Sequence, residues 1–254
     1  MTTSGATPTS CFAWRSCCSP ARIFGGIVTG VIGVLFPPRC ALCGRDLDGL
    51  SVLCPMCESE LPELEGPRCR RCGEPVDAEG LDLCIACGTK DQPLDGAVFL
   101  GPYDGSWGAL VRMLKFNREP AIARDLGRRL ASALEAACIE LAPDWVTYVP
   151  MSRVDRRARG FNQARLLARV IARQIGVPLR RSLVKTRRTV PQGRLSAADR
   201  RRNLRGAFRP VPCFGGNVVL VDDICTTGST IEECARALKR GGAQTVTVLA
   251  VARA

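Results

Sequence analysis

The feature that most constrains the fold of this 254-residue chain is a short apolar run that leads through two aspartates into a hydroxyl-rich loop. Val218–Val221 contains no polar residue, which favours a central parallel strand covered on both faces. Asp222 and Asp223 follow at the carboxyl end of that strand, where open α/β sheets bind their ligands. This order predicts an α/β fold, a parallel sheet with a ligand site at its carboxyl edge. The loop residues are Thr226, Thr227, Gly228, Ser229 and Thr230.

These residue types suit one ribose 5-phosphate. Two neighbouring carboxylates can accept hydrogen bonds from adjacent ribose hydroxyls. Residues 226–230 open a predicted helix, where unpaired backbone N–H groups and the helix dipole favour a phosphate. The alternative is a buried strand whose two aspartates only cap a helix or face solvent. A Walker loop is excluded, because the stretch lacks the Gly-Lys-Ser/Thr sequence that such a loop requires.

Residues 218–230 resemble the signature of type I phosphoribosyltransferases at every key position. In that family the acidic pair holds the ribose hydroxyls of phosphoribosyl pyrophosphate, and the loop holds its 5-phosphate. The resemblance therefore assigns the ribose hydroxyls to Asp222 and Asp223, and the phosphate to residues 226–230. It also implies Mg²⁺, which accompanies phosphoribosyl pyrophosphate. The implied fold is a parallel sheet with helices on both faces.

Far upstream, eight cysteines form four CxxC pairs separated by 10, 11 and 11 residues. Gly44, Gly73 and Gly88 directly follow three of these pairs, which is typical of a turn that points two sulfurs at one ion. Four thiolates complete one tetrahedral Zn²⁺ site, so the spacing predicts two structural zinc sites without an open position for catalysis. The predicted ligands are Cys40, Cys43, Cys54, Cys57, Cys69, Cys72, Cys84 and Cys87.

The spacing leaves the grouping of the ligands and the metal open. We expect two sequential sites, residues 40–57 and residues 69–87, and a crossed arrangement is the alternative. Iron is the alternative to zinc, because all-thiolate ligation alone does not exclude an iron–sulfur cluster. Disulfides would need an oxidising compartment, and neither the composition nor the amino terminus indicates secretion. We therefore expect a cytoplasmic protein.

The sequence predicts three parts. Residues 1–36 form a leader with a short apolar helix, residues 37–90 a small double zinc-ribbon module, and residues 91–254 the phosphoribosyltransferase domain. The apolar run Ile23–Phe36 has 14 residues, fewer than the roughly 20 that span a bilayer, so no transmembrane segment is expected. A peripheral membrane contact is the alternative to packing on the folded body.

Hydrophobic periodicity and turn residues predict strands that alternate with helices, as in a parallel sheet. The polar segment 186–205 is expected to be a mobile loop. Thr230 and Glu233 would form a capping box for the last helix, and Gly241–Gly242 would end it. The expected strands are 97–103, 145–149, 177–179 and 245–251, and the other expected helices lie within 108–137 and at 161–175.

The basic charge of the chain is concentrated in one segment. Residues 151–210 contain 18 Lys and Arg against two acidic residues, a net charge of +16 in a chain whose total is +12. Such a segment attracts anions. A pyrophosphate needs only a few cations, whereas a nucleic acid backbone can use the whole set. Some of them, such as Arg165, Arg169 and Arg173, are equally typical of the solvated face of an amphipathic helix.

Six motifs follow one another between residues 34 and 254: Phe36–Cys40 with the CxxC pairs, Leu114–Phe116, Arg159–Ala164, Gln192–Ser196, Arg202–Phe208 and 218–230. Together they resemble the ComF family of competence-associated proteins, which join a zinc-ribbon region to a type I phosphoribosyltransferase domain. The resemblance implies a role in DNA uptake during natural transformation, with single-stranded DNA and a helicase as partners. One position departs from the family, because serine stands at position 152 where a histidine is often found.

The chain contains no histidine, so acid–base work would fall to carboxylates, lysine or tyrosine. Phosphoribosyl transfer tolerates this, because placed charge and Mg²⁺ stabilise the ribose cation and the leaving pyrophosphate. The candidates to contact pyrophosphate are Ser152, Arg153, Arg156 and Arg157 on the loop expected at residues 152–157, after the strand 145–149, and Arg187, Arg188 and Arg194 on the polar segment.

Two functions fit the sequence. The first is a phosphoribosyltransferase, or an enzyme that binds phosphoribosyl pyrophosphate, with an acceptor that no motif identifies. The second is a non-catalytic module that handles single-stranded DNA and reuses the phosphoribosyltransferase fold. The intact 218–230 motif favours a small ligand, whereas the basic segment and the zinc ribbons favour a macromolecular partner. Lys115 is expected to extend from its helix to solvent, and the alternative is that it reaches the site.

Overall fold

The computed structural model describes residues 38–49, 51–76, 82–89, 92–116, 119–137, 142–187, 197–212 and 215–254. Pro38–Ala254 form one compact unit. The leader and apolar helix predicted for residues 1–36 lie outside the described residues. Among the helices that are described, none is both long and apolar enough to cross a membrane.

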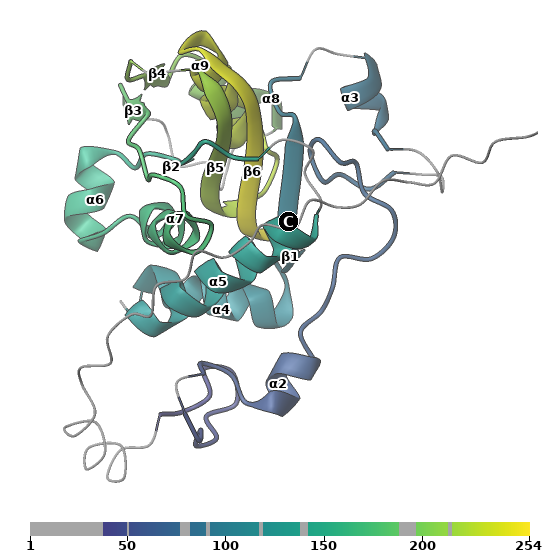
Figure 1. Cartoon of the computed structure of the whole chain (residues 1–254), viewed down its shortest axis with the longest axis vertical. Coiled ribbons are helices and arrows are strands. Elements are labelled where there is room, and N and C mark those ends of the chain that lie inside the picture. Colours follow the sequence, from purple (N-terminus) through teal and green to yellow (C-terminus); the bar gives the residue numbers. More distant parts are fainter. Residues whose placement is uncertain are drawn as a thin grey trace, which may run out of the picture. The chain divides into compact units, whose positions relative to one another are not determined.

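The core of the unit is a parallel sheet with the strand order β1-β6-β5-β2 (Figure 1). The middle strand β5 carries Val218–Val221, whose side chains are all buried, as predicted for a strand covered on both faces. Because the strands are parallel, their carboxyl ends meet at one edge, and Asp222 and Asp223 lie at that edge. The strands are β1 (Gly96–Pro102), β2 (Trp145–Tyr148), β5 (Gly216–Cys225) and β6 (Ala243–Arg253).

Helices cover both faces of the sheet. Val219 and Val221 of β5 belong to the core that includes α4, α5 and α7, whereas Val218 and Leu220 belong to the core that includes α9. This alternation is what a strand with two buried faces requires, because successive side chains point to opposite sides. The sequence predicted helices in all of these regions, and 108–137 divides into two. The helices are α4 (Gly105–Phe116), α5 (Pro120–Ala136), α7 (Gln163–Gln174) and α9 (Ser229–Arg240).

Three segments differ from the prediction. The pyrophosphate loop expected at residues 152–157 instead contains most of α6 (Arg153–Arg159), because Ser152 caps its first turn. Within 186–205, expected as a mobile loop, Ala197–Leu204 form α8, and Leu204 is buried in the core that includes α9. Residues 177–179 make a single bridge to β2 instead of a strand.

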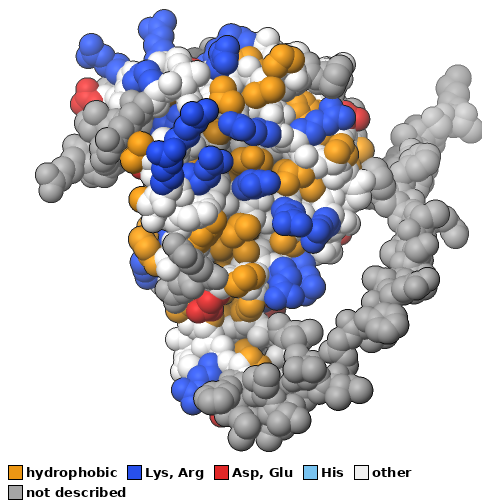
Figure 2. Space-filling view, turned by 90° about the vertical axis from the view of Figure 1, so that its left-hand side faces the viewer, with side chains coloured by type: hydrophobic (Ala, Val, Ile, Leu, Met, Phe, Trp, Pro, Cys, Tyr) orange, Lys and Arg blue, Asp and Glu red, His pale blue; other side chains and the backbone are white. Residues whose placement is uncertain are grey.

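A second, two-stranded sheet pairs β3 (Leu183–Lys185) with β4 (Phe208–Pro210) in antiparallel register. It comes from the basic segment, as α6 and α7 do. The side of the unit that carries α6, α7 and β3 bears many Lys and Arg side chains and few acidic ones (Figure 2). The positive charge that the sequence concentrates in 151–210 is therefore gathered on a surface.

The two cysteine-rich ribbons repeat one turn. The N–H groups of Cys40 and Cys69 donate to carbonyls five residues further on, at 2.7 and 2.8 Å. Gly44 and Gly73 donate back to the carbonyls of Cys40 and Cys69, at 2.9 and 2.7 Å. Both glycines have positive φ angles, 74° and 71°, a conformation that glycine adopts without strain. The later cysteines of each ribbon lie at the start of a short helix, α2 (Pro55–Ser59) or α3 (Ile85–Thr89).

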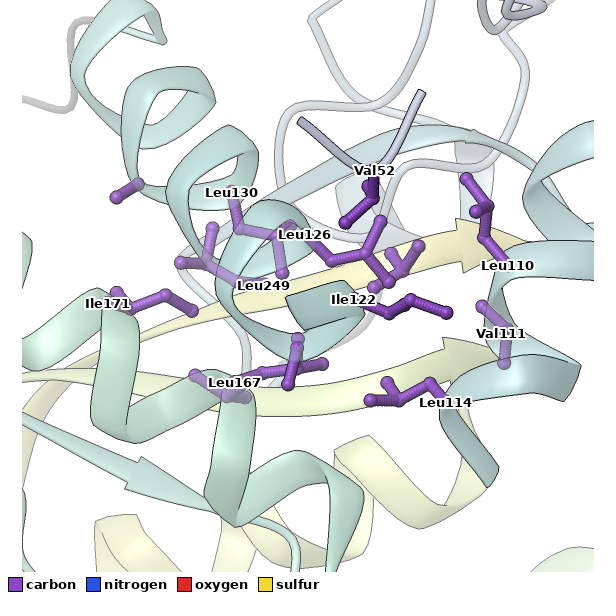
Figure 3. Close-up of a cluster of buried hydrophobic side chains, with 14 of the residues drawn as sticks. Val52, Leu110, Val111, Leu114, Ile122, Leu126, Leu130, Leu167, Ile171 and Leu249 are labelled. Carbon is purple, nitrogen blue, oxygen red and sulfur yellow. The ribbon is translucent and has the colours of Figure 1, made fainter. Parts of the chain in front are cut away.

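The ribbons are attached differently. Val52, Leu53 and Cys54 of the first ribbon are buried in the main core, and Figure 3 shows Val52 among side chains of α4, α5 and α7. The buried residues of the second ribbon form a small cluster of their own, Cys69, Val76 and Cys87. The first ribbon is thus part of the main core, whereas the second has separate packing.

Candidate functional site

The cysteines form two four-sulfur clusters, Cys40–Cys43–Cys54–Cys57 and Cys69–Cys72–Cys84–Cys87, with all sulfurs of a cluster within 4.8 Å of one another. This is the sequential grouping, and the crossed alternative is not formed. The Sγ atoms of Cys43 and Cys54 are 3.6 Å apart, and those of Cys72 and Cys84 are 3.7 Å apart. A tetrahedron of sulfurs about 2.3 Å from a zinc ion has edges of about 3.8 Å. Both clusters therefore fit a closed, structural Zn²⁺ site.

The acidic pair lies at the carboxyl end of β5. The backbone N–H of Asp223 donates to Oδ1 of Asp222 at 2.9 Å, so the two carboxyl groups are held close together. Lys115, in the last turn of α4, forms an ion pair between its Nζ and Oδ2 of Asp223 at 2.9 Å. The prediction that Lys115 extends to solvent is wrong, because its side chain is 21 % exposed and meets the acidic pair. Its position as the polar residue between Leu114 and Phe116 was the signal available in the sequence.

The surroundings of Asp222 disfavour its ionised form. Burial raises the pKa of Asp222 well above its ordinary value, and the negative charge of Asp223 raises it further. The positive charge of Lys115 acts in the opposite direction and lowers that pKa. Lys115 therefore helps to keep the Asp222 carboxylate ionised and able to accept hydrogen bonds.

The loop after β5 turns into α9 at Gly228, which has a φ of 72° and occupies the N-cap position. Gly228 has no side chain to cap the helix, so the first backbone N–H groups of α9 are not capped from that position. The hydroxyls of Thr227 and Ser229 lie 3.0 Å apart across the turn. This start of a 12-residue helix, beside two carboxylates, has donors for an anion and acceptors for hydroxyls.

The predicted capping box of Thr230 and Glu233 is not formed, because the N-cap of α9 is Gly228, two residues before Thr230. The carboxylate of Glu233 instead accepts the Gly206 N–H at 2.9 Å and pairs with Arg236 at 3.5 Å. Glu233 thus links α9 to Gly206, which lies two residues after the end of α8.

A buried arginine supports the loop from behind. Arg253, at the end of β6, is 7 % exposed and donates from Nη1 to the Thr226 carbonyl at 2.6 Å and to Sγ of Cys225 at 2.7 Å. Its Nη2 pairs with Glu74 of the second ribbon. Burial, with a smaller contribution from the charge of Asp222, raises the pKa of the Cys225 thiol to about 12, so this cysteine is a neutral filler. Sequence reasoning missed Arg253 and Glu74, and the signal for Arg253 was a charge at the end of an apolar strand.

A basic groove opens where β2 ends. It has a volume of about 800 Å³, and no acidic side chain is among the described residues that line it. Ser152 is at the groove, but its hydroxyl donates to Asp155 at 2.6 Å and accepts the Asp155 N–H at 3.1 Å, so it serves the cap of α6. The cations of the groove lie on the face seen in Figure 2. They are Arg153, Arg156, Arg157, Arg181, Lys185, Arg187 and Arg209.

The structure brings the candidate pyrophosphate residues together only in part. Arg153, Arg156 and Arg157 line the groove on α6. Arg187 lines it too, but its Nη2 donates to the carbonyls of Asn203 and Arg205, at 2.8 and 3.0 Å. Arg188 and Arg194 lie outside the described residues.

Comparisons with known families identify both parts of the chain. A double zinc ribbon domain matches residues 31–90, and a phosphoribosyl transferase domain matches residues 162–254. The solved structure of adenine phosphoribosyltransferase from Leishmania tarentolae aligns with 62% of this chain and 91% of its own, at 13% sequence identity and a TM-score of 0.37. At that score the similarity does not bear on the site.

Curated relatives match along most of their length. DNA utilization protein YhgH from Escherichia coli O157:H7 is 36% identical over 224 residues, which are 85% of this chain and 97% of that protein. Competence protein F from Haemophilus influenzae is 31% identical over 226 residues, with the same two coverages, 85% and 97%. Competence protein ComFC from Bacillus subtilis is 25% identical over 75% of this chain and 79% of that one. This chain therefore belongs to the ComF family, in which a double zinc ribbon precedes a phosphoribosyltransferase domain.

Proposed function

We propose that this protein binds phosphoribosyl pyrophosphate, or a related ribose 5-phosphate, at the carboxyl edge of its sheet. The observation that carries the proposal is the position of Asp222 and Asp223 at the end of β5, directly before the uncapped start of α9. Carboxylates there can accept hydrogen bonds from two ribose hydroxyls, while backbone N–H groups of 226–230 donate to the 5-phosphate. The relatives' names refer to DNA utilization and competence, so we further propose that the site serves a protein that handles DNA.

The basic groove, which opens at the end of β2, offers the positive charge that a pyrophosphate needs. Arg153, Arg156 and Arg157 offer positive charge next to β2, the strand that pairs with β5. Mg²⁺ that arrives with the pyrophosphate prefers oxygen ligands, and the two aspartates provide them. If transfer takes place, the bond from ribose C1 to pyrophosphate breaks and a bond from C1 to the acceptor forms, while these arginines stabilise the charge of the departing pyrophosphate. Without histidine in the chain, a proton would pass through a carboxylate or lysine.

Calorimetric titration of phosphoribosyl pyrophosphate with Mg²⁺ into the zinc-loaded protein tests the proposal directly. We expect one ligand to bind per chain. If ligand at millimolar concentration produces only the heat of dilution, the ribose phosphate site is rejected. A dissociation constant of millimolar order corresponds to a binding free energy of only about 4 kcal/mol.

Replacing Lys115 by methionine should shift the loss of ligand affinity at acid pH to a higher pH. The aspartates bind ribose hydroxyls best when ionised, so affinity falls as the pH drops through the raised pKa of Asp222. Lys115 lowers that pKa, and its removal lets the pKa rise further. Titrations at a series of pH values measure the shift, and one pKa unit corresponds to about 1.4 kcal/mol between the protonated and ionised states.

Lys115→Arg is the matched control for that experiment. It keeps a positive charge at the same place on α4 and should retain a pH profile close to that of the unmodified protein. A Lys115→Met profile that superimposes on the unmodified one would contradict the assigned role of the ion pair.

A second candidate function, binding of single-stranded DNA, is favoured by the size and charge of the groove. A pyrophosphate would occupy a small part of about 800 Å³, and seven cations exceed what it needs. A sugar–phosphate backbone can use such a row of charges, because each neutralised phosphate releases counterions. Aromatic side chains for base stacking are not among the groove-lining residues described, so we propose contacts to phosphates.

The triple substitution Arg153→Ala, Arg157→Ala and Arg209→Ala should weaken DNA binding and flatten its dependence on salt. Each lost phosphate contact lowers the slope of log K against log salt by about 0.7 for a single strand, so the slope should fall by about 2. Fluorescence anisotropy with a short labelled oligonucleotide at several salt concentrations measures it. The control removes three exposed arginines of α7 that do not line the groove, Arg165, Arg169 and Arg173, and should keep the slope. Equal effects of the two triple variants would mean that the groove has no special part in DNA binding.

A further inference from the structure

The second zinc ribbon is joined to the sheet through a few specific contacts. The carbonyl of Arg70 accepts the Ala97 N–H of β1 at 3.0 Å. The ring of Phe99, also on β1, packs so closely on Gly73 that a Cβ at Gly73 would overlap it. Gly73 directly follows the zinc ligand Cys72. The turn that carries the ligands of the second site therefore rests on β1.

The next residue of that turn reaches the phosphate loop through Arg253. Glu74 pairs with Nη2 of Arg253, while Nη1 of the same guanidinium donates to the Thr226 carbonyl at 2.6 Å. The guanidinium also lies over the Phe99 ring, 5.9 Å from its centroid. Arg253 is thus held on one side by the second ribbon and on the other by the loop.

Elsewhere the ribbon and the loop are separated by a cavity. It has a volume of about 120 Å³ and is lined by Cys72, Cys84 and Cys87 on one side and by Cys225, Thr227 and Gly228 on the other. Among the residues that the structure describes, the guanidinium of Arg253 bridges the two, from Glu74 of the ribbon to the Thr226 carbonyl of the loop.

We propose that Arg253 is a positioning residue through which zinc in the second ribbon and a ribose phosphate on the loop stabilise each other. The inference rests on the proposed function of the loop. Glu74 is positioned by the metal-bound turn, since its carbonyl accepts the Cys69 N–H at 2.8 Å. When the turn loses its metal, Glu74 moves away from Arg253. The guanidinium of Arg253, which is 7 % exposed, then lacks its counter-charge, and a buried unpaired charge is destabilising. The cation then moves toward water, and the Thr226 carbonyl loses its donor.

Thermodynamic reciprocity gives the proposal a readout other than catalysis. If zinc favours the loop conformation that binds the ligand, the ligand must favour retention of zinc by the same factor. Zinc loss from each ribbon can be followed separately, because cysteines that lose their metal become open to alkylation. Residues 40–57 and 69–87 fall on different tryptic peptides, so mass spectrometry assigns the loss to one ribbon.

The experiment exposes the full chain to a zinc-selective chelator and an alkylating reagent, with and without phosphoribosyl pyrophosphate and Mg²⁺. In the unmodified protein the ligand should slow alkylation of 69–87 by about 5- to 150-fold, the usual range of coupling between two sites. Alkylation of 40–57 should not change. Glu74→Gln keeps the size of a side chain that is 49 % exposed but removes its charge, so the protein should fold and the ligand effect on 69–87 should disappear.

Two variants make the result specific. Glu58→Gln removes the ion pair of the first ribbon with Arg129, 2.9 Å from Nη1 to Oε1, and should leave the coupling intact. Arg253→Lys keeps a positive charge for Glu74 and should restore part of the coupling that Arg253→Met loses. If these residues only stabilised the fold, the ligand effect on alkylation would not be intact in Glu58→Gln, partial in Arg253→Lys and lost in Arg253→Met.

The outcomes separate the inference from the function on which it rests. If calorimetry detects no ligand binding to the unmodified protein, the proposed function fails, and the coupling fails with it. If the ligand binds but does not slow alkylation of 69–87, only the coupling is overturned. Coupling in Glu74→Gln as strong as in the unmodified protein would also overturn it.

Discussion

The double substitution Asp222→Asn and Asp223→Asn is expected to reduce the affinity for phosphoribosyl pyrophosphate by at least about 100-fold, because it removes two charged acceptors that each contribute about 1.5–3 kcal/mol. Asparagine preserves the shape of both side chains, so the sheet edge should remain folded. The change also releases Lys115 from its 2.9 Å ion pair with Asp223. Calorimetric titration with Mg²⁺ at neutral pH measures the loss.

The control for this prediction is Asp125→Asn on α5. Asp125 has a similar exposure, 21 % against 16 % for Asp223, and also forms an ion pair, at 2.6 Å with Nε of Arg129. Its partner Arg129 also pairs with Glu58 of the first ribbon and not with the acidic pair, so ligand affinity should be unchanged. Binding by the double variant at the affinity of the unmodified protein would reject the acidic pair as the ribose site.

The same double variant distinguishes the two candidate functions. The basic groove does not include Asp222 or Asp223, so DNA binding should survive the substitution. A variant that loses the sugar phosphate but keeps salt-sensitive DNA binding would assign the two ligands to neighbouring, separate sites. A simultaneous loss would indicate one shared site at the sheet edge.

Local sequence patterns were enough to predict the sheet edge and the metal clusters. Four consecutive apolar residues fix β5 as a strand buried on both faces, and the following aspartates must then lie at its carboxyl end. The CxxC spacing predicts the sulfur clusters, because Gly44 and Gly73 permit the turn that each cluster needs. Each of these conclusions depends on residues close together in the chain.

Contacts between distant segments were not predictable in the same way. Lys115 and Asp223, or Glu74 and Arg253, meet only because the sheet order places their elements side by side. No local pattern contains that information. The helix α6 is a different case, because the Ser152–Asp155 spacing is a capping pattern that was present in the sequence. The helix α8 was missed because its polar sequence has little apolar periodicity.

Loss of metal should have unequal consequences in the two ribbons. Cys54 of the first ribbon is 6 % exposed and adjoins Leu53 and Val52, which are buried in the main core with side chains of α4 and α5. Cys54→Ser removes a ligand and frees this segment, and each buried Val or Leu side chain contributes about 1.5–3 kcal/mol. Two of them amount to about 3–6 kcal/mol, a large share of the 5–15 kcal/mol that stabilises a typical domain. The whole unit should therefore unfold at a clearly lower temperature.

Cys87→Ser, in contrast, should melt only the second ribbon, whose buried cluster of Cys69, Val76 and Cys87 is separate. Differential scanning calorimetry with a parallel zinc assay tests the pair of variants, and equal losses of stability would contradict the difference in attachment. The Cys87→Ser protein should nevertheless have a lower affinity for ribose phosphate, because Glu74 no longer holds Arg253 against the loop. Under this interpretation the first zinc stabilises the fold, and the second stabilises the phosphate loop.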